Sequence, residues 1–275
     1  MVTRTGTQAG ALPEKLGPGE AGAPAAAVAL SGVSHAYGAL TALSGIDLAV
    51  APGETIGFVG PSGCGKSTLL ELVAGLLEPT GGTVTVGGAA DPAGRLAACA
   101  YMPQRDLLFP WYSALDNAAL PLRNRGARRR EARLGAHALF ERFGLAGFEQ
   151  SAPAELSGGM RQRVAFLRTL TAGKPVLLLD EPFAALDALT RADMQEWLAG
   201  ALSPAGRTTL LVSHDVEEAL YLCDRLLVMS SRPGTVVREL RTEHPRAAGR
   251  DEAVTAPGFV ALREEALRAL REGSP

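Results

Sequence analysis

A stretch of nine residues, Gly60-Pro-Ser-Gly-Cys-Gly-Lys-Ser-Thr68, combines the residue types that bind phosphate. Its glycines free the backbone to turn N–H groups inward, and the helix expected after it presents its positive end to an anion. The spacing G-x-x-x-x-G-K-[ST] sets Lys66 to reach the β and γ phosphates and the Ser67 hydroxyl to bind Mg²⁺. A glycine-rich turn without a ligand is the alternative, which the Lys-Ser pair disfavours. The candidate nucleotide-binding residues of this loop are Gly60, Pro61, Ser62, Gly63, Cys64, Gly65, Lys66, Ser67 and Thr68.

A second candidate element is the run Val176-Leu-Leu-Leu-Asp-Glu-Pro182, in which four apolar residues lead into two acids. Such a run predicts a buried strand that delivers carboxylates to the edge where open α/β sheets bind ligands. Asp180 would hold Mg²⁺ through water, and Glu181 would orient or deprotonate the attacking water. Acids that merely cap a strand are the alternative. Beside the phosphate loop, the run predicts a nucleoside triphosphatase in which Lys66 and Glu181 are catalytic.

The phosphate loop and the acidic run must both be held at the edge of a sheet. The order of predicted strands and helices along the chain predicts such a sheet. Apolar and β-branched runs predict strands, whereas helical spacing of apolar residues predicts helices. The predicted strands cover 27–34, 42–50, 55–59, 81–86, 97–101, 175–179, 208–213 and 225–229. The predicted helices cover 66–77, a block at 113–148, segments that begin near 159 and 188, and 216–222. This alternation predicts a mostly parallel sheet with helices on its faces.

The run Leu156-Ser-Gly-Gly-Met-Arg-Gln-Arg163 narrows the class of nucleoside triphosphatase. Followed at a short interval by Asp180-Glu181, it resembles the signature motif of ATP-binding cassette (ABC) ATPases. Ser157, Gly158 and Gly159 are expected to open a helix and to form a second anion-binding helix terminus. The resemblance implies that this terminus closes on ATP held by a partner subunit. Two ATP molecules would then lie between two head-to-tail cassettes, so a homodimer is expected.

Four further residues match landmarks of the ABC family in their order along the chain. The resemblance implies that Tyr37 stacks on adenine and that Gln104 contacts the metal region. It also implies that His214 holds the γ phosphate and the attacking water in line as a catalytic residue, and that Asp187 contacts the opposite subunit. Taken alone, an aromatic residue or a histidine at a strand end is more often structural. The metal ligands implied are Ser67, Gln104 and Asp180, and the cofactors are ATP and Mg²⁺.

The resemblance covers roughly residues 27–232 and implies a fold and a domain organisation. The fold is an α/β P-loop ATPase core with a mostly parallel sheet, an N-terminal antiparallel β subdomain and an inserted α-helical subdomain. We expect a flexible tail at 1–25, an ATPase domain at 26–240 with its insertion at about 105–160, and a linker and helix at 241–275. Met160 stands where Gln is frequent in the family, and Ala184 stands where Ser is frequent. Neither change removes a phosphate contact, so hydrolysis is still expected, and the change at Ala184 bears on communication between subunits.

Composition limits the partners that this chain is expected to have. The 275 residues carry a formal net charge of −2, which gives no global attraction to nucleic acid or to an anionic membrane. The uncharged run at 21–46 is broken by Gly, Ser, Pro and His, so it is a poor membrane span. Three widely spaced cysteines favour a reducing compartment over a disulfide framework. Cys64, beside Lys66, is expected to be reactive.

A single cassette without a membrane span or a heptad-rich arm implies separate membrane partners, as in bacterial importers. The patterns LLFPW…LDN and LSGGMRQR are similar to those of the ATPase subunits of nitrate, sulfonate, taurine and pyrimidine-precursor importers. We therefore expect integral membrane permease subunits, an indirect periplasmic or extracellular solute-binding protein, and a peripheral position on the cytoplasmic face of the inner membrane. The alternative is a soluble ABC ATPase that acts on nucleic acid or ribosomes.

Two segments leave their interpretation open. The aromatic segment 105–117 is expected either to seal the joint between core and insertion or to contact the membrane partner, because large aromatic residues dominate interface hot spots. A basic cluster in the insertion is expected to be a solvated helix face, with nucleic-acid binding as the alternative. Its members are Arg123, Arg125, Arg128, Arg129, Arg130 and Arg133. Apolar residues at helical spacing in the last forty or so residues predict a terminal helix docked on the cassette.

Overall fold

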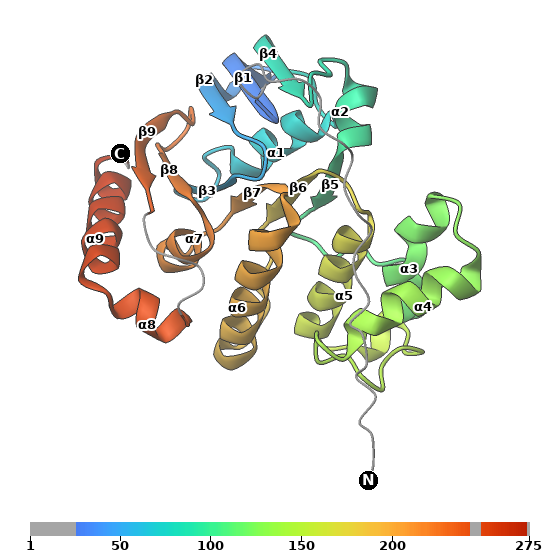
Figure 1. Cartoon of the computed structure of the whole chain (residues 1–275). Helices are drawn as coiled ribbons and strands as arrows, with labels where there is room; N and C mark the ends of the chain where they lie inside the picture. Colours follow the sequence, from blue (N-terminus) through green and yellow to red (C-terminus); the bar gives the residue numbers. More distant parts are fainter. Residues whose placement is uncertain (1–25, 243–248, 274–275) are drawn as a thin grey trace.

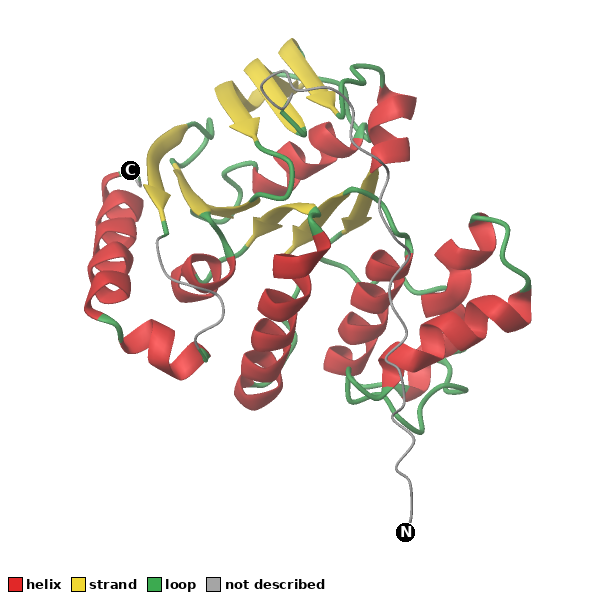
Figure 2. Cartoon of the chain, in the orientation of Figure 1, coloured by secondary structure: helices red, strands yellow, loops and turns green. Residues whose placement is uncertain are grey.

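Strands and helices alternate along most of the chain in the computed structural model, which describes residues 26–242 and 249–273. Figure 1 follows the chain through two sheets and the helices packed on them, and Figure 2 separates the strands from the helices. The tail expected at 1–25 lies outside the described residues. Among the residues that are described, no helix has the length and apolarity to span a bilayer.

The larger sheet has six strands in the order β5-β6-β7-β3-β8-β9. Its strands are β3 (Thr55–Val59), β5 (Cys99–Met102), β6 (Val176–Asp180), β7 (Thr208–Val212), β8 (Arg225–Met229) and β9 (Val236–Arg241). All neighbouring pairs are parallel except β8 and β9, which run antiparallel. The carboxyl ends of β3 and β6 therefore meet at one edge, where the phosphate loop and the acidic pair begin.

The smaller sheet is antiparallel, with the order β2-β1-β4. It is built from β1 (Val28–Tyr37), β2 (Leu40–Val50) and β4 (Gly81–Val86). Helix α1 (Lys66–Ala74) packs against both sheets and lies between them in Figure 1. The two sheets confirm the fold predicted from the sequence, a mostly parallel ATPase core with an antiparallel N-terminal sheet.

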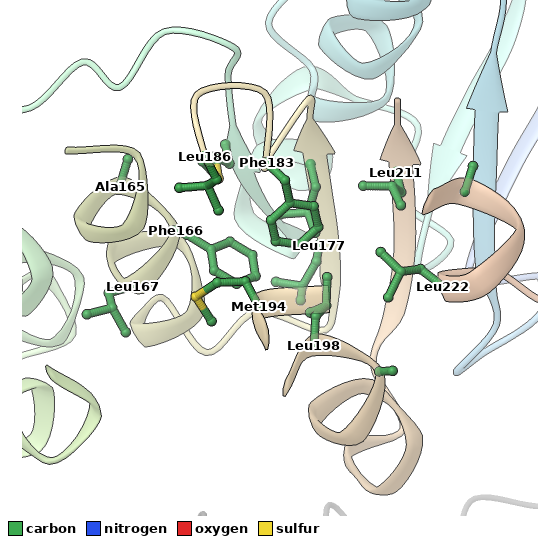
Figure 3. Close-up of a cluster of buried hydrophobic side chains, with 14 of the residues drawn as sticks. Ala165, Phe166, Leu167, Leu177, Phe183, Leu186, Met194, Leu198, Leu211 and Leu222 are labelled. Carbon is green, nitrogen blue, oxygen red and sulfur yellow. The ribbon is translucent and has the colours of Figure 1, made fainter. Parts of the chain in front are cut away.

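The large sheet separates two hydrophobic cores, because successive residues of a strand face opposite sides. In β6, Val176 and Leu178 pack toward α1 and the small sheet, whereas Leu177 and Leu179 pack toward the helices of the other face. Figure 3 shows the second core, in which Phe166 and Phe183 meet beside the sheet. Helices α5 (Gly158–Thr171), α6 (Ala188–Ala205) and α7 (Val216–Leu222) supply this layer.

Two pairs of helices extend the molecule at opposite ends of the large sheet (Figure 1). Helices α3 (Ala114–Asn124) and α4 (Arg129–Phe140) form the inserted helical part with α5, and a short 3₁₀ turn, η1 (Pro153–Glu155), precedes α5. Helices α8 (Arg250–Thr255) and α9 (Pro257–Glu272) follow β9. Phe259 and Ala266 of α9 are buried in the same core as α6 and α7.

The structure corrects the strand predicted at 97–101. Its first two residues end a helix, α2 (Pro92–Ala98), and only the following residues belong to β5. Asp91 caps α2 by accepting a hydrogen bond from Gly94 N, and Pro92 occupies the first helical position. That cap and proline are a recognised start signal for a helix. Strand β9 and helix α8 were not predicted.

Candidate functional site

The phosphate loop joins the end of β3 to the start of α1, as its motif predicts. Gly65 has φ 104° and precedes the helix, and a Cβ built on it would lie 2.7 Å from Leu43 Cδ2. A Cβ on Gly60 would lie 2.9 Å from Cys64 Sγ. Any other residue at these two positions would displace the loop, so the close packing around it requires glycine.

Lys66 lies inside this loop. Its ammonium group donates hydrogen bonds to the carbonyl oxygens of Gly60 at 2.7 Å and Pro61 at 3.0 Å, and the residue is 7% exposed. The loop therefore holds a cation at its centre, where a nucleotide phosphate would be bound. Cys64 is 1% exposed, with Sγ 3.7 Å from Lys66 Nζ. This burial corrects the expectation of a reactive thiol: Cys64 fills space under the loop.

Asp180 ends β6 and is 2% exposed. Burial raises its pKa, while hydrogen bonds from Ser67 and Tyr101 and the charge of Lys66 oppose that effect. Ser67 and Asp180 thus lie together, as the sequence predicts. Tyr101 was not predicted to take part. Burial and the neighbouring Asp180 raise the pKa of its hydroxyl, so it remains a hydrogen-bond donor.

Glu181 is the point at which three predicted residues meet. Its Oε2 accepts a hydrogen bond from Gln104 Nε2 at 3.0 Å and lies 3.6 Å from His214 Nδ1. The backbone of Glu181 has φ 50°, a left-handed conformation, and its N–H donates to Val212 O at 2.9 Å. The turn therefore points this carboxylate away from the strand that carries Asp180, toward the loops that bear Gln104 and His214.

Gln162, on α5, fixes the turn that carries Glu181. It is 6% exposed, its Nε2 donates to Glu181 O at 2.8 Å, and its Oε1 accepts from Ala185 N at 2.8 Å. Sequence reasoning gave Gln162 no role, although it lies within the signature run. Its amide is the only direct hydrogen-bond link between α5 and this turn among the described contacts, so it ties the signature helix to the acidic pair.

The signature residues begin α5 as predicted. Ser157 caps the helix, with Oγ accepting a hydrogen bond from Met160 N at 3.2 Å, and Ser157 and Gly158 are exposed. A Cβ on Gly159 would lie 3.2 Å from Ala185 O, so glycine permits close contact with the turn after Glu181. Within residues 26–242 and 249–273, no hydrogen bond joins Ser157, Gly158 or Gly159 to the phosphate loop. One chain therefore carries two separate helix N-termini of the kind that can bind anions, at α1 and at α5.

Asp187 and Tyr37 are both surface residues near the ends of elements. Asp187 caps α6, and the hydrogen bond from Thr190 N at 3.1 Å lowers its pKa. Tyr37 is 48% exposed, and its hydroxyl lies 3.3 Å from Thr68 Oγ1, so its ring stands next to the phosphate loop. An exposed ring in this place is available for a flat base, whereas His35 supports it edge-on with ring centroids 4.6 Å apart.

The loop that follows Gln104 is organised by Asn117. This fully buried side chain accepts from Phe109 N at 2.8 Å and donates to the carbonyl oxygens of Phe109 at 3.1 Å and Tyr112 at 3.3 Å. Leu107 has φ 44° and is 55% exposed, and Trp111 is 71% exposed. Leu108 packs on the core, as sealing of the joint predicts, whereas Leu107 and Trp111 face solvent, and their contact with a membrane partner stays a prediction.

Two arginines of α5 bind the same loop. Arg161 Nε donates to Asp106 Oδ2 at 3.0 Å, and Arg168 donates to Asp106 O at 2.7 Å and to Leu107 O at 2.8 Å. The signature helix therefore touches the loop after Gln104 through its arginines and the Glu181 turn through Gln162. We expect a shift of the loop after Gln104 to be transmitted to the signature helix and to the Glu181 turn.

The basic cluster of the insertion is partly engaged within the protein. Asp116, 5% exposed, lies 2.7 Å from Arg133 Nη1 and 2.9 Å from Arg129 Nη2. Burial tends to raise the pKa of Asp116, but the hydrogen bonds from both arginines hold it below its usual range. Two members of the cluster thus pair with a buried carboxylate of the insertion, whereas Arg128 and Arg130 are exposed, as expected of a solvated helix face.

The chain is similar in sequence to known proteins. The ABC transporter family model matches residues 43–184. An aliphatic sulfonates import ATP-binding protein of Rhodococcus jostii is 46% identical over 241 residues, covering 88% of this chain and 92% of that protein. A taurine import ATP-binding protein of Chromobacterium violaceum is 44% identical over 230 residues, 82% of this chain and 88% of that protein.

Two further matches are also ATP-binding proteins of this kind, one by sequence and one by structure. A formylaminopyrimidine import ATP-binding protein of Halalkalibacterium halodurans is 44% identical over 202 residues, 73% of this chain and 78% of that protein. Among solved structures, a dimeric ATP-binding cassette in a post-hydrolysis state with ADP and Pi has a TM-score of 0.72 and 31% identity. It covers 79% of this chain and 99% of its own. These relatives do not support an ATPase that acts on nucleic acid or ribosomes.

Proposed function

This chain belongs to the ABC transporter family, and from that membership we propose that it powers import of a small solute through separate membrane subunits. It is an ATP-binding and ATP-hydrolysing subunit of an importer. The names of its relatives favour a solute of the sulfonate, taurine or pyrimidine-precursor kind. The subunit would work at the cytoplasmic face of the membrane, with a solute-binding protein acting on the far side of the permease.

The observation that supports this proposal is a hydrogen-bond link between an exposed loop with apolar side chains and the candidate catalytic carboxylate. The loop that bears Leu107 and Trp111 begins at Gln104, which donates its hydrogen bond to Glu181. Large exposed aromatic residues are suited to anchor a partner protein. A membrane subunit docked on this loop would therefore act on Gln104 and, through it, on Glu181.

We propose a role for each group of side chains at the nucleotide site. Backbone N–H groups of the loop at 60–65 and the ammonium group of Lys66 would bind the phosphates, with adenine on Tyr37. Glu181 would accept a proton from the attacking water, and His214 would hold that water in line with the γ phosphate. The exposed end of α5 would complete the site of a second copy, which Asp187 would also contact.

The donor set fits Mg²⁺, a hard cation that prefers oxygen ligands. Ser67 offers a hydroxyl and Asp180 a carboxylate, and the two lie within hydrogen-bond reach of each other. Gln104 donates through its nitrogen to Glu181, which leaves the amide oxygen free for a metal. Bound there, Mg²⁺ would neutralise phosphate charge during hydrolysis.

Affinity purification tests the importer proposal. Tagged Glu181→Gln protein, isolated with ATP from detergent-solubilised membranes of its own cells, is expected to retain an integral membrane protein in near-equal amount. Trp111→Ala in the same background should lose that protein while it still binds ATP. Recovery of ribosomal proteins or nucleic acid without a membrane subunit would contradict the importer proposal and leave the ATPase chemistry standing.

A further inference from the structure

The loop after β8, residues 230–235, lies against the phosphate loop. Its Gly234 N–H donates to Ala42 O at 2.9 Å, and its carbonyl accepts from Ser44 N at 3.1 Å. A Cβ on Gly234 would collide with the carbonyl of Cys64, so the two loops are in direct backbone contact. Ala42 and Ser44 belong to β2. The loop is therefore fixed between the small sheet and the nucleotide site.

Side-chain and helix contacts fix the same loop from its other side. Ser230 Oγ accepts from Thr235 N at 3.0 Å and donates to Ser231 O at 2.9 Å. Ser231 N donates to Gly273 O, at the end of α9, across 2.8 Å. With both ends and one flank bonded, the loop has little freedom to carry its side chains away from the phosphate loop.

Arg232 extends from this loop to the tip of the phosphate loop. A Cβ built on Gly63 would lie 3.5 Å from Arg232 Nη2, which is ordinary van der Waals contact. Arg232 is exposed, and among residues 26–242 and 249–273 its guanidinium has no hydrogen bond or ion pair. Arg238, on the adjacent strand β9, is instead bonded to Glu265 at 3.2 Å. An unpaired guanidinium thus stands beside the loop that binds phosphate.

We propose that Arg232 is an additional nucleotide-binding residue, which binds a phosphate of ATP from the exposed tip of the phosphate loop. This inference rests on ATP being the ligand of that loop. Lys66 is buried in the loop and bonded to its carbonyls, whereas Arg232 lies at the exposed tip, so the two cations approach from different positions. A guanidinium presents parallel N–H groups that match phosphate oxygens, which an ammonium group cannot reproduce.

Nucleotide titration of the purified full chain tests this role. Affinity for a slowly hydrolysed ATP analogue with Mg²⁺ is expected to fall on the order of tenfold in Arg232→Gln. Arg232→Lys should recover only part of the loss, because lysine restores the positive charge but not the parallel N–H groups of the guanidinium. Arg238→Gln is the matched control, an exposed arginine on the next strand, and its affinity should equal that of the wild type.

A second variant tests whether the loop must hold Arg232 in place. Ser230→Ala loosens the loop, so it should weaken ATP binding in the wild type and have no further effect in Arg232→Gln. Wild-type affinity in Arg232→Gln, or an equal loss in Arg238→Gln, would overturn the proposal while the ATPase assignment stands. If the wild type itself binds no ATP, the proposed function fails as well. Thermal melting of each variant confirms that it is folded.

Discussion

Gln104 donates a hydrogen bond from Nε2 to Oε2 of Glu181 across 3.0 Å, and the two residues are separated by 77 positions in the chain. The contact joins the first residue of the exposed loop to the carboxylate that we assign to water activation. We therefore expect movement of the loop to change the direction and the hydrogen bonding of that carboxylate. A partner that binds the loop is thus expected to control hydrolysis without touching the nucleotide.

Glu181→Gln should preserve ATP binding and nearly abolish turnover. Glutamine keeps an oxygen that accepts the hydrogen bond from Gln104, but it cannot take a proton from water. Loss of a general base lowers rates by roughly 10²–10⁴-fold. Phosphate release measures turnover, titration measures ATP affinity, and gel filtration with ATP should show a stable dimer. Normal steady-state hydrolysis would remove Glu181 from the catalytic role.

Gln104→Ala should raise the Mg²⁺ concentration required for half-maximal nucleotide-dependent hydrolysis, on the order of tenfold. The variant loses both the amide oxygen proposed as a metal ligand and the hydrogen bond that orients Glu181. Binding of ATP measured without Mg²⁺ should be unchanged. Arg105→Ala, at the neighbouring exposed position, serves as the control. An unaltered Mg²⁺ dependence would exclude Gln104 as a ligand.

Glu218 gives the fold a predictable dependence on pH. Burial raises its pKa from the ordinary 4.5 to about 6, although Gln195 Nε2 donates to its carboxylate at 2.9 Å. The folded state therefore binds a proton more tightly than the unfolded state, and this stabilisation is full below pH 4.5 and lost as the pH rises through 6. A shift of this size corresponds to about 2 kcal/mol.

Glu218→Gln removes the buried charge and should stabilise the protein at pH 8 by roughly 1–2 kcal/mol relative to the wild type. Near pH 4.5 the difference should shrink toward zero. Urea unfolding at both pH values measures it, with Glu264→Gln on the exposed side of α9 as the control. A gain that is equal at both pH values would show that packing, rather than ionisation, is responsible.

Asp116→Asn should weaken the helical insertion. The substitution leaves the shape of the side chain but removes the charge that pairs with Arg129 and Arg133, and the free energy of unfolding should fall by about 1–3 kcal/mol. Denaturant unfolding and limited proteolysis of α3 and α4 measure the effect. Arg130→Gln, on the same surface, should change stability by less than about 0.5 kcal/mol. Equal losses in both variants would contradict the assigned ion pairs.

The sequence predicted the parts of the site that local spacing defines. The phosphate loop, the acidic pair and the signature residues each lie within one short run, and the boundaries of β3, α7 and β8 match their predicted ranges. These elements carry strong apolar patterns with clear ends. The general fold follows from their alternation, because strand-helix order fixes a parallel sheet.

Other features depend on contacts between distant positions. Gln162 and Asn117 act through hydrogen bonds to backbone groups elsewhere, and no pattern of residue types marks them in advance. Strand β9 escaped prediction because Leu240 is its only buried residue, so the run lacks apolar alternation. Helix α2 lacks a fully buried apolar face, since its single buried residue is Arg95 and only Ala98 packs partly on the core.

The backbone of Glu181 is left-handed, with φ 50°. This conformation lowers stability at the position where the proposed function requires a carboxylate. A residue with a side chain loses roughly 1–2 kcal/mol in this conformation, whereas glycine adopts it freely. Selection of random variants for heat resistance alone, without demand for ATP turnover, would therefore enrich glycine or asparagine at position 181. We expect glutamate to remain there only where hydrolysis is required, so a chain that has lost its transport task should lose this residue early.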